Sequence, residues 1–244
     1  MEPIYSKVFE ISDVHVNCFG RLKTSMILYM AQEVAGAHFE KLAMDYDALE
    51  SQGLFWAITR HKVQVSRLPR YGEKIRIETW PMPTTRVAYP RSMVAYDEAG
   101  NECFRAITLW VLMDLKARAM VLPGKSGIDV PGTLRGNELS SPLGLPAKAL
   151  RNRRSRWVNF TDLDRNGHMN NTKYLDWIDD LLPSSFHGAH TVKEFTVCYL
   201  NEALEGQELK LDWDFPEENC LFMDAQRDNG EKTERVFAAK ILYD

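Results

Sequence analysis

The sequence has four cysteines, and no two of them form a Cys-x-x-Cys pair. Cys18, Cys103, Cys198 and Cys220 are scattered along the chain, which disfavours both a zinc site and a disulfide framework. No apolar run approaches the roughly 18 residues that a membrane-spanning helix needs. The opening residues also lack the apolar core of a signal peptide. These absences favour a reduced, cytoplasmic protein with no metal and no membrane span.

Several common catalytic signatures are missing as well. There is no Gly-x-Ser-x-Gly motif for a serine hydrolase, and no glycine-rich loop that would bind a nucleotide phosphate. The net charge of −4 argues against a general nucleic-acid-binding protein. The composition, 45% hydrophobic and 26% charged, is that of an ordinary globular protein with an ample core, and it implies no cofactor.

The chain matches itself at three places that keep the same order. Residues 13–17 match residues 162–166 at an offset of 149, and two shorter matches follow at smaller offsets. One of the shorter matches aligns the residues around Gly72 with those around Gly206, and the other aligns the residues around Gly100 with those around Gly230. Each match is weak alone, but three in order indicate a tandem duplication.

Both halves have the same expected order of elements, namely a short strand, a helix and several alternating strands. The short strands are expected at Val8–Ile11 and Trp157–Phe160, and Pro183 ends the second helix. This order predicts an α+β fold made twice. We expect an N-terminal domain over 1–122, a Pro/Gly-rich linker over 123–150 and a C-terminal domain over 151–244.

Residues 162–174 contain the most informative cluster of polar side chains. Asp164, Asn166 and His168 fall at alternate positions between an expected strand and an expected helix. A carboxylate, an amide and an imidazole can together hold a water, orient an acyl carbonyl and move a proton. Taken alone, the Asp and the Asn would be read as turn and helix-capping residues.

This motif, Asp-x-Asp-x-Asn-x-His-x-Asn-Asn-x-x-Tyr-x-x-Trp before a helix that ends at proline, resembles that of the acyl-ACP thioesterase family. The resemblance covers essentially the whole chain. It implies a double hotdog fold, in which an antiparallel sheet wraps a long helix twice in tandem. It also implies hydrolysis of fatty acyl-ACP to free fatty acid and holo-ACP, which terminates fatty acid synthesis.

The resemblance also implies the rest of the catalytic site. Glu202 falls on the family's catalytic glutamate, on the strand after the second helix, while Ala203 stands where plant members carry cysteine. Asp164, Asn166, His168 and Glu202 should converge, with Glu202 favoured over Asp164 as base or nucleophile. The aligned first-half positions are His15, Asn17, Phe19 and Leu68, so one active site is expected, in the C-terminal half.

The resemblance assigns the acyl pocket to the first half of the chain. The candidate substrate-binding residues are Met26, Met30, Val34, Phe55, Trp56 and Tyr174, and an ordinary hydrophobic core explains the apolar residues equally well. The implied partner is acyl carrier protein, which is strongly acidic. A basic run of Arg151, Arg153, Arg154 and Arg156, just before the second-half strand, is the candidate docking surface.

Three other functions remain open. The chain could be an acyl-CoA thioesterase with the same chemistry, a hotdog dehydratase, or a non-catalytic acyl-binding protein. The placement of Asn166 and Glu202 argues against the dehydratase, and the intact polar set argues against the non-catalytic protein. The sequence leaves open whether the protein is a monomer or a homodimer, and which acyl chain length it prefers.

Overall fold

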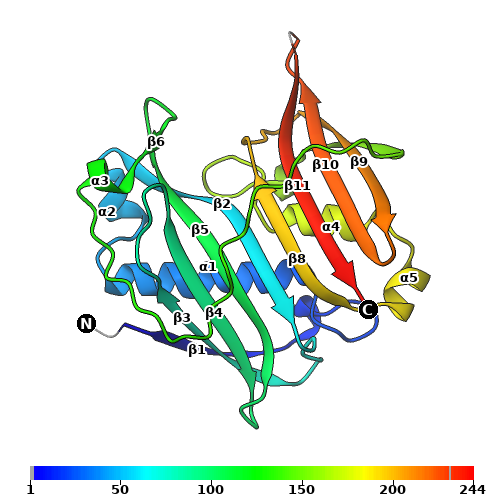
Figure 1. The fold of residues 1–244 in the computed structure, drawn as a ribbon, viewed down its shortest axis with the longest axis horizontal. Coiled ribbons are helices and arrows are strands. Elements are labelled where there is room, and N and C mark those ends of the chain that lie inside the picture. Colours follow the sequence, from blue (N-terminus) through cyan, green and yellow to red (C-terminus); the bar gives the residue numbers. More distant parts are fainter. Residues whose placement is uncertain (1–2, 231) are drawn as a thin grey trace. The chain divides into compact units, whose positions relative to one another are not determined.

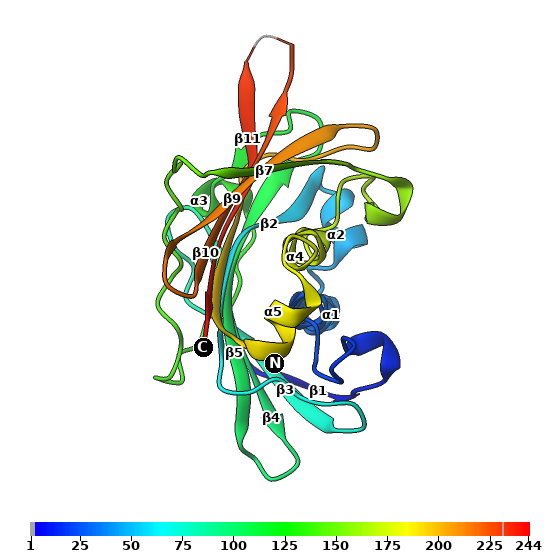
Figure 2. The ribbon, with the colours of Figure 1, turned by 90° about the vertical axis from the view of Figure 1, so that its right-hand side faces the viewer.

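The computed structural model describes residues 3–230 and 232–244, which divide into two compact units. The N-terminal unit is Met1–Pro142 and the C-terminal unit is Leu143–Asp244. Each unit has an antiparallel sheet with its principal helix packed along one face (Figures 1 and 2). The α+β fold expected from the sequence is therefore confirmed. Within the described residues, no helix combines the length and the apolar character needed to cross a bilayer.

The N-terminal unit contains one long helix, α1, and a sheet with the strand order β1-β3-β4-β5-β2, to which β6 adds by pairing with β5. Its elements are β1 (Tyr5–Glu10), a 3-10 turn (Asp13–His15), α1 (Thr24–Lys41), α2 (Tyr46–Glu50), β2 (Leu54–Val65), β3 (Lys74–Pro81), β4 (Tyr89–Asp97), β5 (Glu102–Asp114), β6 (Met120–Val121) and α3 (Pro123–Ser126).

The C-terminal unit contains shorter helices and a sheet with the strand order β7-β9-β10-β11-β8. Its elements are β7 (Asn152–Trp157), a 3-10 turn (Phe160–Asp162), α4 (Lys173–Asp179), α5 (Ser184–Ala189), β8 (Val192–Tyr199), β9 (Glu208–Glu217), β10 (Cys220–Asp228) and β11 (Thr233–Tyr243). Element by element, this path repeats that of the N-terminal unit. The tandem duplication inferred from three weak sequence matches is thus a duplication of the fold.

Helix α1 forms because apolar side chains recur every three or four residues along it and make a buried stripe on the face toward the sheet. Ile27, Met30 and Val34 are each fully buried, and His38 at the next turn is nearly so. Burial of such a stripe, rather than helix propensity, supplies most of the stability of a helix of this length. The face of the N-terminal sheet that α1 covers therefore forms the core of this unit.

The structure corrects two expectations at the start of the C-terminal unit. The strand expected at Trp157–Phe160 ends at Trp157, and Phe160–Asp162 is a 3-10 turn that Asn159 caps. The expected second helix is short, because α4 covers Lys173–Asp179 and a turn separates it from α5. At the expected strand Trp157–Phe160, hydrogen bonding by Asn and Asp side chains favours a turn over the strand that the short alternating pattern predicts.

Part of the segment expected as a linker packs on the N-terminal sheet, on the face away from α1. The indole Nε1 of Trp80 donates a hydrogen bond to Glu138 at 3.1 Å, and the Arg135 guanidinium lies 4.9 Å from the same ring. The backbone N–H of Thr133 also donates to the Pro81 carbonyl at 2.9 Å. These contacts explain why the first part of the expected linker belongs to the N-terminal unit, which ends at Pro142.

His61 on β2 is an unusual core residue, because it is fully buried and titratable. Its Nδ1 lies 2.8 Å from the hydroxyl of Thr108 on β5. Burial disfavours the imidazolium and lowers the pKa of His61 from 6.5 to about 3. The unfolded chain therefore takes up a proton at pH values where the folded protein does not, and stability falls as the pH drops below 6.5.

We expect His61→Gln to remove this acid sensitivity, because glutamine stays neutral throughout. Between about pH 7.5 and about pH 5, the wild type should lose about 2 kcal/mol more unfolding free energy than the variant. Urea unfolding of both proteins at the two pH values measures the difference. Equal losses in the two proteins would mean that His61 is not protonated preferentially on unfolding.

Candidate functional site

Asp164 organises the turn that carries the candidate polar residues. Its Oδ1 accepts hydrogen bonds from the backbone N–H groups of Asn166 at 2.8 Å and of His168 at 3.2 Å. The turn closes with Gly167 in the left-handed region at a φ of 75°. An aspartate that accepts from the following amides is the usual device for such a turn. Asp164 therefore fixes the backbone from which the His168 side chain projects.

Backbone pairing joins this turn to the connection between β8 and β9. His168 forms an isolated antiparallel bridge with Leu204, and the Met169 N–H donates to the Ala203 carbonyl at 2.8 Å. This pairing places the imidazole Nε2 of His168 3.5 Å from Oε2 of Glu202. The His168 side chain is 19% exposed and that of Glu202 is 45% exposed, so the pair is accessible to water.

Glu202 lies three residues beyond the end of β8 at Tyr199, in a loop rather than on the expected strand. Two residues missed by sequence reasoning hold this loop. Arg227 on β10 donates hydrogen bonds to the Glu202 carbonyl and, at 2.8 Å, to Oε1 of Gln207. That same oxygen of Gln207 accepts the Leu204 N–H at 3.0 Å. Arg227 is a positioning residue that no local motif could have revealed, because it acts from a different hairpin.

The remaining candidates of the C-terminal unit occupy different environments. Asn166 is exposed at the tip of the turn, and the structure gives its side-chain amide no hydrogen bond within the described part of the chain. Tyr174 is buried in the core, where its ring stacks on Phe237 at 4.4 Å. Burial raises the pKa of Tyr174, so its hydroxyl stays protonated at neutral pH.

The N-terminal unit contains the same turn without the same chemistry. Asn17 Oδ1 accepts the N–H groups of Phe19 at 3.0 Å and of Arg21 at 3.2 Å, and Arg21 bridges to Arg70 as His168 bridges to Leu204. The offset that aligns the two turns in the structure is thus two residues shorter than the offset of 149 that the sequence match gives. The true counterparts of Asp164, Asn166 and His168 are Asn17, Phe19 and Arg21, while Leu68 remains the counterpart of Glu202.

The expected substrate-binding residues of the N-terminal unit do not share one surface. Met30 and Val34 are fully buried on α1, and Met26 is partly buried. Trp56 faces α1, where it stacks on Phe39 at 4.9 Å. Phe55 precedes it on the same strand, lies on the opposite face of the sheet and contacts the Arg118 guanidinium at 4.8 Å.

The candidate docking arginines lie at the start of and along the edge strand β7, and three of the four have carboxylate partners. Arg151 pairs with Asp214 at 2.5 Å, Arg153 with Asp212 at 2.5 Å and Arg156 with Asp180 at 2.6 Å. The Arg151 guanidinium holds the pKa of Asp214 below its usual range. Arg154 donates instead to the backbone carbonyl of Asp180 at 2.9 Å, and no carboxylate in the described part of the chain pairs with it.

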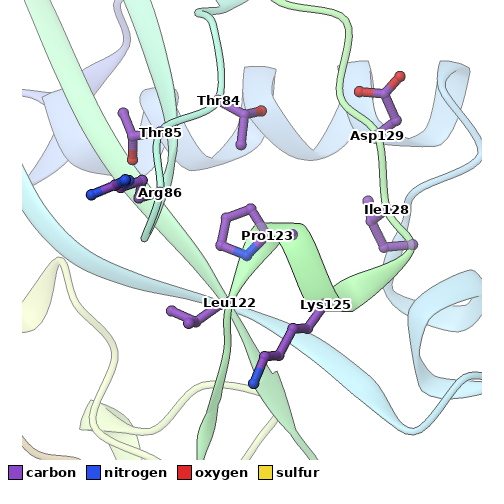
Figure 3. A pocket seen from close by; sticks show the side chains of 9 residues that line it. Thr84, Thr85, Arg86, Leu122, Pro123, Lys125, Ile128 and Asp129 are labelled. Atoms are coloured by element: carbon purple, nitrogen blue, oxygen red, sulfur yellow. The ribbon is translucent and has the colours of Figure 1, made fainter.

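An open groove of about 670 Å³ lies in the N-terminal unit (Figure 3). It is lined by Thr84, Thr85, Arg86, Leu122, Pro123, Gly124, Lys125, Ile128 and Asp129. None of the candidate catalytic, substrate-binding or docking residues lines it, so we assign it no part in the site. Across the described residues, no three His, Cys, Asp or Glu side chains are placed to hold a metal ion together.

The geometry of each unit, a sheet packed on a helix and repeated in tandem, is that of hotdog proteins. An acyl-ACP thioesterase from Bacteroides thetaiotaomicron superposes with a TM-score of 0.89 at 23% identity, covering 99% of this chain and 98% of that one. The 12:0-ACP thioesterase from Umbellularia californica superposes with a TM-score of 0.84 at 20% identity, covering 100% and 98%. These likenesses establish the tandem hotdog fold.

The family follows from the sequence comparisons. The profile of the acyl-ACP thioesterase N-terminal domain matches residues 2–122, and that of the C-terminal domain matches residues 147–241. The chain therefore belongs to the acyl-ACP thioesterase family.

Two curated relatives illustrate the distance within the family. An oleoyl-acyl carrier protein thioesterase of Coriandrum sativum is 25% identical over 209 residues, which cover 78% of this chain and 56% of that protein. A dodecanoyl-[acyl-carrier-protein] hydrolase of Cinnamomum camphora is 24% identical over 217 residues, covering 82% and 56%. Both are described as chloroplastic. The match thus spans little more than half the length of these relatives.

Proposed function

We propose that this protein hydrolyses the thioester of a fatty acyl-ACP, releasing free fatty acid and holo-ACP and so terminating fatty acid synthesis. The observation that carries the proposal is the pairing of His168 with Glu202 at 3.5 Å beside the Asp164 turn, in a chain of the acyl-ACP thioesterase family. A cytoplasmic location belongs to the same proposal, and the four free thiols support it.

In the proposed reaction, Glu202 acts as the base. Its carboxylate takes a proton from a water, and the resulting hydroxide attacks the thioester carbonyl carbon. The exposed amide of Asn166 donates to the oxyanion that forms. When the tetrahedral intermediate collapses, the carbon–sulfur bond breaks and His168 delivers a proton to the leaving thiolate. Glu202 then returns its proton to His168, which restores both groups.

We assign this chemistry to the C-terminal unit and the acyl chain to the N-terminal unit. The counterpart turn in the N-terminal unit has Asn17, Arg21 and Leu68, so it lacks both the carboxylate pair and the imidazole. The proposed acyl-binding residues are Met26, Met30, Val34 and Trp56, which lie on α1 or face it. Phe55, on the other sheet face, and Tyr174, in the C-terminal core, do not share that surface.

The direct test is to supply the purified chain with acyl-ACP and acyl-CoA carrying the same fatty acyl group. We expect release of fatty acid and holo-ACP, detected by mass spectrometry, with a higher kcat/KM for the ACP thioester. A clear preference for CoA would replace our substrate with acyl-CoA. Binding of acyl-ACP without any hydrolysis would identify a non-catalytic acyl-binding protein.

The docking of ACP is part of this proposal. We assign it to the candidate docking arginines at the start of and along β7, with Arg154 as the principal contact. Arg151, Arg153 and Arg156 already pair with carboxylates, so their charges are largely compensated within the unit. Exposed charges of this kind mainly steer an acidic partner and act on its association rate.

Arg154→Ala should therefore raise KM for acyl-ACP about two- to fivefold at low salt, while leaving the hydrolysis of acyl-CoA unchanged. Steady-state kinetics with both substrates measure this. The matched control is Arg76→Ala, which removes an exposed, ion-paired arginine of the N-terminal unit. An equal rise in KM for the control would show a general charge effect and no docking role for Arg154.

A further inference from the structure

Arg91 on β4 is a buried cation that has no carboxylate partner among the described residues. It is 3% exposed, and its Nη1 lies 3.1 Å from Nδ1 of His38 and 3.4 Å from the hydroxyl of Thr79. Its guanidinium lies 4.5 Å from the centre of the Phe39 ring. Over residues 3–230 and 232–244, its Nε and Nη2 have no hydrogen-bond acceptor. Two N–H donor groups therefore point into the interior unsatisfied.

This arrangement is costly, and the sheet does not compensate for it. Burial lowers the pKa of Arg91 to about 9, so the group is still cationic at neutral pH. A buried charge that lacks an opposite charge costs several kcal/mol. Buried polar groups in native proteins nearly always have partners, so an orphaned donor indicates a ligand or a role in function.

A second buried donor lies beside Arg91. Trp110 on β5 faces the same side of the sheet, because its neighbour Thr108 on that face pairs directly with Arg91. The indole ring of Trp110 contacts the edge of Phe39 at 5.6 Å, and its Nε1 also lacks an acceptor within the described part of the chain. Both side chains thus supply donors around one ring and no acceptor, which is the pattern expected for binding an oxygen atom.

The donors lie at one end of the apolar stripe of α1. Met30, Val34 and His38 follow at intervals of four residues, so they form one line on the helix face that the sheet covers. An acyl chain running along Met30 and Val34 would meet His38 and Arg91 at the next turn. A plain methyl end placed there would leave the donors unsatisfied, whereas an oxygen would accept from them.

We propose that Arg91 is a specificity-determining residue that selects acyl chains carrying an oxygen acceptor, such as a hydroxyl or oxo group, near the end remote from the thioester. This inference rests on the proposed binding of the acyl chain in the N-terminal unit. Arg91 and Trp110 supply the N–H donors, and Phe39 and the α1 stripe supply the apolar walls. A plain chain is accommodated where it ends before His38.

The test compares kcat/KM for acyl-ACPs with a terminal hydroxyl and for their plain counterparts, over a series of matched chain lengths. At the length that reaches Arg91, the wild type should prefer the hydroxylated chain about tenfold, the effect of a hydrogen bond to a charged group. Arg91→Met, which keeps the volume and removes the donors, should abolish that preference and extend the range of plain chains. Trp110→Phe should reduce the preference by less.

Ser92→Ala is the matched control, because Ser92 is equally buried on the same strand but faces the opposite side of the sheet. It should leave the preference intact. A ratio of hydroxylated to plain turnover that is the same in wild type and Arg91→Met would overturn the proposal. Because the ratio is taken within one protein, partial unfolding of a variant does not affect it.

A binding measurement separates this inference from the proposed hydrolysis. Acyl-pantetheine analogues with an amide in place of the thioester are not cleaved, and calorimetry gives their affinities with and without the terminal hydroxyl. Tighter binding of the hydroxylated analogue to wild type, lost in Arg91→Met, would support the inference even if no thioester were hydrolysed. Equal affinities in the wild type at every length would refute it even if hydrolysis were rapid.

Discussion

Replacement of Glu202 by glutamine should lower kcat/KM for acyl-ACP hydrolysis by about 10²- to 10³-fold, because glutamine keeps the shape of the side chain but cannot accept a proton. The fold should not change. Glu202 lies in a loop with its side chain 45% exposed, and the loop is held through its backbone carbonyl by Arg227. Single-turnover hydrolysis, with unfolding measured in parallel, separates the loss of chemistry from any loss of structure.

The control for this variant is Glu205→Gln. Glu205 is exposed in the same connection between β8 and β9, so its replacement removes the same charge from the same loop. It should leave kcat/KM within about twofold of wild type, as expected for an exposed charge that takes no part in the proposed proton transfers. If the two variants lost activity equally, the loop would matter only through its charge, and Glu202 would not be the base.

The elements that the sequence predicts well are those set by regular periodicity. The stripe of α1 repeats every three or four residues over the 18 residues of Thr24–Lys41, and it is buried as expected. The hairpin between β4 and β5 also forms where Gly100 allows a φ of 84°. Hydrophobic periodicity and the glycine needed at a positive φ are properties of short segments, so they can be predicted directly from the sequence.

The alignment of the two halves shows where local signals mislead. Matching residues 13–17 to 162–166 pairs Asp13 with Asp162, which are the same residue type but occupy different positions in the fold. The structure pairs Asn17 with Asp164 instead, because both side chains accept backbone N–H groups in the same turn. An amide and a carboxylate are interchangeable as acceptors, so the conserved feature is the hydrogen bond, which sequence identity does not reveal.

Ion pairs between strands distant in the sequence left no local signal by which to predict them. The partners of Arg151 and Arg153 are Asp214 and Asp212, about sixty residues away in the sequence and adjacent only through the register of β7 and β9. From the sequence alone, the basic run predicts a strongly positive patch. In the fold, carboxylates pair with most of its arginines and compensate their charge. For the same reason Arg227, which holds the Glu202 loop from β10, carried no recognisable signal.

The Asp164→Asn variant should fold as the wild type does and yet lose about 10²-fold in kcat/KM. Asparagine can make this turn, because Asn17 accepts the equivalent N–H groups in the N-terminal unit. The substitution therefore retains the backbone of His168 and removes a single negative charge next to it. In the proposed reaction this charge lies beside the residue that donates to the leaving sulfur, so its loss should weaken the electrostatic stabilisation of the transition state and raise the barrier.

Asp164→Ala completes the comparison, since it removes both the charge and the turn. It should lose activity at least as severely and should also lose about 2 kcal/mol of stability, because two backbone N–H groups are left without their acceptor. Thermal unfolding and kinetics of the two variants together distinguish the roles of Asp164. Full activity in Asp164→Asn, with a loss confined to Asp164→Ala, would reduce Asp164 to a turn-forming residue and leave Glu202 as the one carboxylate needed for the chemistry.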